Sequence, residues 1–82
     1  MMPRYFFDTH DGSWEATDEN GQCFSGLEAA RVEAVRALRD MAWDELERSD
    51  VSAMTVRVRD EDGQAVFVAT LSLTAEAAGT AR

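Results

Sequence analysis

The residues best suited to chemistry lie around one short segment near the N-terminus. His10 is the only histidine of the chain, and Asp8 and Asp11 flank it. A histidine beside carboxylates can bind a metal ion or transfer a proton, because its unperturbed pKa lies near neutrality. One hypothesis is therefore a small ligand- or metal-binding domain, or a small enzyme, built on Asp8, His10 and Asp11.

The single cysteine, Cys23, adds no second site to this cluster. A structural zinc site normally takes four ligands in two close pairs, and a nucleophilic cysteine needs a base within hydrogen-bonding reach. Cys23 and His10 are far apart in the sequence and match neither pattern. The sequence thus predicts no catalytic residue, no metal ligand and no cofactor outside the His10 cluster.

Two acidic pentapeptides, residues 18–22 and 60–64, are nearly identical. They resemble the start of a calcium-binding EF-hand loop, which also requires glycine at its sixth position and glutamate at its twelfth. Neither segment has these residues. We interpret both as turns closed by a left-handed glycine, Gly21 and Gly63, with one hairpin geometry used twice.

Composition and charge exclude several classes of protein. The chain has 82 residues, of which 45% are hydrophobic and 29% charged, as in an ordinary single folded domain. Its formal net charge of -8 repels a phosphate backbone, so general nucleic-acid binding is not expected. One cysteine cannot form an internal disulfide, and no apolar run approaches the roughly 20 residues of a membrane helix. We expect a cytoplasmic protein that binds no membrane.

Arginine supplies all eight basic residues. If strand alternation holds, Arg4, Arg57 and Arg59 share one sheet face with Phe6. Faces that combine aromatic residues and arginine bind single-stranded nucleic acid in some modules. A weak nucleic-acid binder that uses these three arginines is therefore a third hypothesis.

The order of elements predicts an α+β domain of topology ββαββ. We expect strands at residues 4–9, 14–17, 54–60 and 65–73, and one long helix that starts after Ser25, runs to about residue 48 and packs on one face. The four-stranded, mainly antiparallel sheet has the order 2-1-3-4 or, alternatively, 2-1-4-3. Residues 1–73 form the single domain, and residues 74–82 form a flexible, alanine-rich tail.

The apolar residues exceed what one helix and one small sheet can cover. Beside its core-facing stripe the helix carries a second cluster, which consists of Val32, Val35, Trp43 and Leu46. On the sheet face away from the helix we expect Phe6, Val66 and Val68. Surplus apolar surface marks interaction sites, which predicts a homodimer or a complex with another protein. The choice between the helix and the sheet as the interface stays open.

The chain resembles a family of small bacterial proteins of unknown function that begin with a Pro-Arg-Tyr-Phe-Phe strand, here residues 3–7. The Asp-Gly turn at residues 11–12, the Leu-Glu-Ala-Ala-Arg helix start at 27–31 and the Asp-x-x-Gly strand end at 60–63 match the same pattern. The resemblance implies a hairpin, helix, hairpin domain and brings no activity, cofactor or partner. The leading hypothesis is a non-catalytic protein-interaction module.

Overall fold

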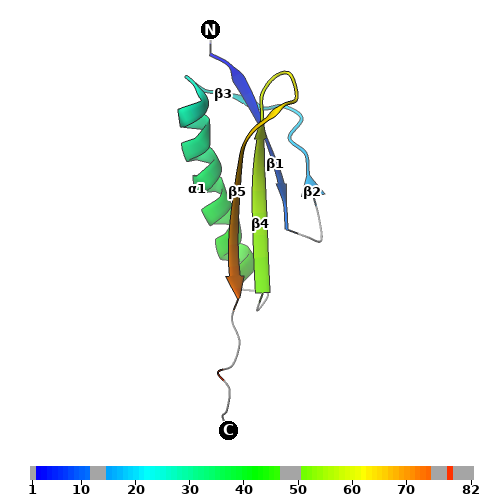
Figure 1. Cartoon of the computed structure of the whole chain (residues 1–82), viewed down its shortest axis with the longest axis vertical. Coiled ribbons are helices and arrows are strands. Elements are labelled where there is room, and N and C mark those ends of the chain that lie inside the picture. The colour runs from blue at the N-terminus through cyan, green and yellow to red at the C-terminus, as the bar shows by residue number, and fades with distance from the viewer. Residues whose placement is uncertain (1, 12–14, 47–50, 75–77, 79–82) are drawn as a thin grey trace.

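A computed structural model describes residues 2–11, 15–46, 51–74 and 78, with backbone alone at 44–46, 51–52 and 74. The described elements are β1 (Arg4–His10), β2 (Glu15–Ala16), β3 (Gln22–Cys23), α1 (Leu27–Leu46), β4 (Val51–Arg59) and β5 (Ala65–Thr74). The helix covers one face of an antiparallel sheet (Figure 1), so the predicted α+β class is confirmed. The predicted tail over residues 74–82 lies almost entirely outside the described residues.

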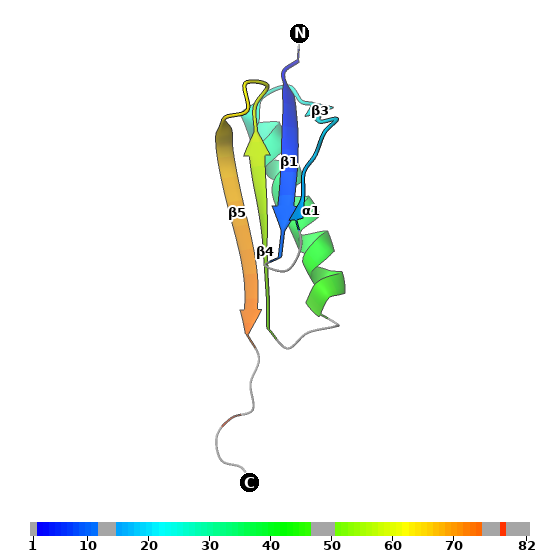
Figure 2. The same ribbon diagram turned by 90° about the vertical axis from the view of Figure 1, so that its right-hand side faces the viewer.

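Within the described residues the sheet has five strands, so the prediction of a four-stranded sheet is wrong, although the four predicted strands correspond to β1, β2, β4 and β5 and lie in the predicted order. The strands follow the path β2-β1-β4-β5, and β3 also pairs with β1. The alternative order, with the last strand in the middle, is wrong as well: β5 lies at an edge beside β4 (Figure 2). A tight turn fixes β5 next to β4, and β1 occupies the other side of β4.

The strand that the sequence did not reveal, β3, lies on the same edge of β1 as β2. Residues of β2 pair with Thr9 and His10, whereas residues of β3 pair with Arg4 and Tyr5. The two short strands therefore form one edge strand that is broken by residues 17–21. Two residues are too few to show the alternation that identifies a strand, which explains why β3 was missed.

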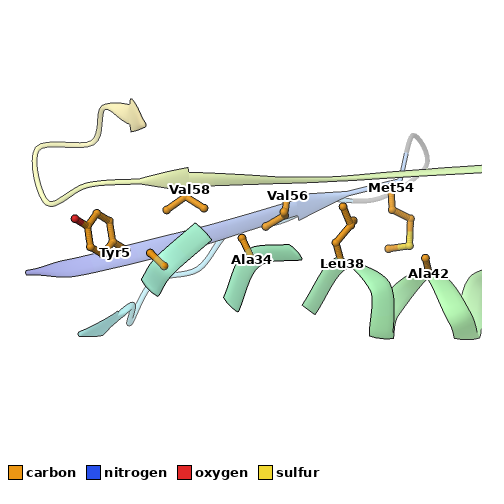
Figure 3. Packing of buried hydrophobic residues seen from close by; sticks show 8 residues of the cluster. Tyr5, Ala34, Leu38, Ala42, Met54, Val56 and Val58 are labelled. Carbon is orange, nitrogen blue, oxygen red and sulfur yellow. The ribbon is translucent and has the colours of Figure 1, made fainter. Parts of the chain in front are cut away.

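Small residues on α1 bring the helix close to the sheet. Ala34, Leu38 and Ala42 face Met54, Val56 and Val58 of β4 (Figure 3). These three β4 residues face the helix because side chains alternate along a strand, so that every second one points to the same face of the sheet. Val56 and Val58 are fully buried. The core-facing stripe predicted on the helix is thus confirmed at Ala34, Leu38 and Ala42.

The two similar pentapeptides form different connections. Both glycines have positive φ, 69° at Gly21 and 85° at Gly63, as predicted. Around Gly63 the Asp60 N–H donates to the Gln64 carbonyl at 2.9 Å and closes a true hairpin between β4 and β5. Around Gly21 the chain instead passes from β2 to β3 along one edge. The prediction that one hairpin geometry is used twice is therefore wrong for the first segment.

Candidate interaction surface

The outer edge of β5 lacks the features that usually protect an exposed strand. Within the described residues β5 pairs only with β4, and its ten residues include no charged residue, proline or glycine. Val68, Leu71 and Leu73 are exposed along it. Soluble proteins normally shorten, charge or cover such an edge, because its free N–H and C=O groups pair readily with another strand.

The opposite edge of the sheet shows that protection. There β1 is covered by β2 and β3, each only two residues long. Very short edge strands offer few free backbone groups, so another chain has little to pair with. The two edges therefore differ in kind, and only the β5 edge is long and uncharged.

A shallow groove runs between α1 and the β5 edge. It has a volume of about 270 Å³ and is lined by Glu28, Arg31, Val32, Val35, Arg39 and Phe67. The Arg31 guanidinium carbon lies 5.2 Å from the centre of the Phe67 ring, and its Nη1 donates to Glu28 Oε1 at 2.9 Å. The groove thus has apolar walls in its middle, with Glu28 and Arg31 at one end of its helical side and Arg39 at the other.

The structure brings part of the predicted helix cluster to this groove. Val32 and Val35 line it, and their exposed fractions are 62% and 39%. Trp43 is 71% exposed and is not among the lining residues. The side chain of Leu46 lies outside the described residues. The surface predicted from the sequence did not include Phe67.

The predicted sheet-face residues do not form one apolar patch. Val68 is 52% exposed and lies opposite Arg57. Phe6 is half-buried, and the Arg59 guanidinium carbon lies 5.0 Å from the centre of its ring. Val66 packs against the buried core, which corrects its predicted placement on the far face. The register shifts at this point, since Val58 pairs with Phe67 but Arg59 with Ala65, and the extra residue disrupts the alternation.

A polar network occupies the far face beside the broken edge strand. The Nε of Arg59 donates to Asp8 Oδ2 at 2.5 Å, and its Nη2 donates to Asp8 Oδ1 at 3.0 Å. The same Nη2 also donates to the Asp18 carbonyl at 3.0 Å. This bidentate geometry fixes the guanidinium more firmly than a single contact would. Arg59 therefore holds β1, β4 and the segment between β2 and β3 together.

The Asp18 carboxylate accepts a backbone hydrogen bond from β1 in the gap between β2 and β3. It accepts N–H groups from Phe7 at 3.1 Å, from Asn20 at 3.1 Å and from Gly21 at 3.0 Å. Where β1 has no neighbouring strand to accept the Phe7 N–H, a side chain thus accepts it instead. Sequence reasoning missed this role, although the repeated Asp-x-x-Gly pattern was the available signal.

The family comparison covers nearly all of the described fold. Residues 4–72 match the model of "Domain of unknown function (DUF6894)". The chain belongs to the DUF6894 family. The match begins with β1 and ends within β5, so it includes every other described helix and strand of this DUF6894 domain and most of β5. The predicted membership of an uncharacterised small-domain family is confirmed. No curated protein and no solved structure matches the chain significantly.

The network sets the ionisation of two carboxyl groups in the DUF6894 domain. The hydrogen bonds from Arg59 lower the pKa of Asp8, and they outweigh the opposing effect of burial. Burial raises the pKa of Asp18, but the N–H groups of Gly21, Phe7 and Asn20 together reverse this effect and leave the pKa lowered. Both aspartates are therefore stabilised in their ionised form by folding.

We predict that acid weakens the domain through these two groups. A carboxyl whose pKa is lowered by folding binds more protons in the unfolded chain, so its contribution is complete above the unfolded pKa of about 3.9 and is lost as pH falls through the folded pKa. The free energy of unfolding, measured by urea titration, should fall below about pH 4, and the Asp8→Asn variant should show a shallower fall. Glu19→Gln is the control, because Glu19 is exposed and makes none of these hydrogen bonds. A wild-type domain with level stability between pH 5 and pH 2.5 would contradict this account.

The predicted His10 cluster lies at a hollow near the end of β1. The hollow has a volume of about 270 Å³ and includes His10, Glu15 and Arg57 in its lining. Asp8 also lines it, but both carboxylate oxygens of Asp8 accept hydrogen bonds from Arg59. Among the described residues no three His, Cys, Asp or Glu side chains are grouped to hold a metal ion. Asp11 lies outside the lining of the hollow.

The three arginines proposed for nucleic-acid contact have different surroundings. Arg59 is held by Asp8, and Arg4 donates from Nη1 to the Asn20 carbonyl at 2.8 Å. Arg57 is exposed beside the hollow. Two of the three guanidinium groups thus already contact their own chain.

In the described part of the DUF6894 domain, no helix has the length and apolar character needed to cross a membrane.

Proposed function

We propose that the protein is a non-catalytic protein-interaction module that acts as a homodimer through the edge of β5. The observation that carries the proposal is the ten-residue β5 strand, which is uncharged and has a neighbour on one side only within the described residues. Although 29% of the residues of the chain are charged, β5 has no charged residue. Another strand can therefore pair along this edge at the lowest cost in free energy.

A second copy of the chain is a suitable occupant of this edge. Two β5 strands related by a two-fold axis perpendicular to the sheet are antiparallel, and their pairing joins two sheets into one continuous sheet. Both helices then lie on the same face. Pairing of this kind gives main-chain hydrogen bonds and covers the exposed Val68, Leu71 and Leu73. A domain of this size also benefits, because a small chain buries only a modest fraction of its surface alone.

The solution mass tests this proposal. One chain has a mass of 9.1 kDa, and light scattering across a wide range of protein concentration should give twice that value at the high end, with a return to 9.1 kDa on sufficient dilution. A mass of 9.1 kDa at every concentration would show that the edge takes no second copy.

A further inference from the structure

The groove beside β5 is self-complementary in its order of side chains. Along the groove the helix presents an acid, Glu28, with its intrahelical partner Arg31, then the two valines Val32 and Val35, then a base, Arg39. Val32 and Val35 lie equally far from the midpoint between Glu33 and Ala34, and so do Glu28 and Arg39. An antiparallel copy of this helix therefore presents Arg39 opposite Glu28 and a valine opposite each valine, while Arg31 faces Arg36, which does not line the groove and pairs with Glu33 and Asp40 of its own helix.

We infer that the homodimer proposed above has a defined register, in which Glu28 of each copy pairs with Arg39 of the other and Val32 lies beside Val35. This inference rests on the proposed β5 edge. A two-fold axis that makes the β5 strands antiparallel also makes the α1 helices antiparallel, as the charge order requires. Because Phe67 lies in the same groove as Val32 and Val35, the axis passes near Phe67 and Val68 of β5.

Both charged groups are available for such contacts. Arg39 makes no ion pair with another described residue, in contrast to Arg31, Arg36 and Arg59. The Glu28 side chain is 79% exposed, and its contact with Arg31 uses Oε1 and leaves Oε2 open. Both side chains are long enough to reach across a gap between neighbouring helices. The dimer would therefore gain two equivalent ion pairs, one on each side of the axis.

The same charges disfavour other arrangements. A parallel pair of helices would place Glu28 beside Glu28 and Arg39 beside Arg39, and like charges at close range raise the free energy of a complex. A partner helix that places an acid opposite Glu28 or a base opposite Arg39 would meet the same repulsion. The groove therefore selects a second copy of this chain in one orientation, while the β5 edge supplies most of the affinity.

Charge reversal provides the test. We expect Glu28→Arg and Arg39→Glu each to raise the dissociation constant of the homodimer about tenfold, because each change turns two attractive pairs into two repulsive ones. When the two variants are mixed, the heterodimer has both ion pairs, one as in the wild type and one with its acid and base exchanged. Native mass spectrometry of the mixture, with one chain isotopically labelled, should show the heterodimer in clear excess over the statistical half.

The matched control is Asp40→Arg. Asp40 is also exposed on α1 and pairs with an arginine at 3.3 Å, but it does not line the groove. This variant should dimerise like the wild type and mix with it statistically. Circular dichroism should show the same helix content in all three variants.

The outcomes separate the two proposals. A dimeric wild type whose Glu28 and Arg39 variants mix statistically would overturn the register and leave the β5 dimer intact, whereas a monomeric wild type would overturn both.

Discussion

Replacement of Gly21 by alanine should cost the domain about 3 kcal/mol of its free energy of unfolding. Gly21 has a φ of 69°, a backbone conformation that costs an alanine about 1 kcal/mol. A Cβ built there lies 2.8 Å from Phe6 Cε2 and 2.9 Å from Arg4 Cγ, so the strand beside it must shift, at a further cost of about 2 kcal/mol. Thermal unfolding should move down by roughly 12 to 24 °C for a domain of this size.

Gly63→Ala is the matched control for this experiment. Gly63 has a similar φ of 85°, but a Cβ there meets no atom within 4 Å. The Gly63→Ala variant should therefore lose only the part of the free energy of unfolding that comes from backbone conformation, about 1 kcal/mol. Both variants and the wild type should be unfolded by heat at one protein concentration. Equal losses in the two variants would contradict the close packing of Phe6 and Arg4 against Gly21.

Replacement of Val68 by lysine should raise the dissociation constant of the homodimer at least about a hundredfold. Val68 is exposed on β5, so a single chain can carry the lysine in water without a change in its core. In the dimer two lysines would lie close together near the two-fold axis, and like charges on paired strands repel. Lysine is also a common protector of natural edge strands. Light scattering or analytical ultracentrifugation measures the effect.

Gln22→Lys shows whether that effect belongs to the β5 edge. Gln22 is exposed on β3, at the opposite edge, and the change adds the same charge to the protein. It should leave the dissociation constant within about twofold of the wild-type value. If Gln22→Lys weakened the dimer and Val68→Lys did not, the interface would lie at the edge formed by β2 and β3 and not at β5.

Hydrophobic periodicity was sufficient to predict the main architecture. The apolar stripe of the helix and the alternation around Val56 and Val58 are regular over many residues, and both describe the observed core. The positive φ of Gly21 and Gly63 was predictable as well, because the residue pattern of such turns is strongly constrained. These features depend on residues that are close together in the sequence, so the sequence alone was enough to predict them.

Features that depend on contacts between distant residues were not predictable in the same way. The strand β3 has two residues and exists because Arg4 and Tyr5 provide a partner for it. Val66 leaves the predicted face because the register shifts between Val58 and Arg59, and nothing in the local pattern indicates that shift. The contact of Arg59 with Asp8 and Asp18 joins three segments that are far apart in the sequence.

The candidate site was predicted in part. Val32, Val35 and Val68 were expected to be surplus apolar residues, and all three are exposed. Whether they belong to one surface or two depends on which strand forms the edge, and that is a property of the whole sheet. Once β5 lies at the edge, the groove lined by Val32 and Val35 is next to it. The sequence offered the helix and the sheet as alternative interfaces, and the fold makes them neighbours.

Hydrogen exchange of the β5 amides in the wild-type protein tests the central claim most directly. In a single chain, the amides of β5 that do not donate to β4 face solvent and exchange quickly. We predict that these amides exchange slowly at concentrations where the mass is twice 9.1 kDa and quickly after dilution to the monomer. A dimer in which the outward amides of β5 still exchange quickly, with new protection elsewhere, would show that the interface is not the β5 edge.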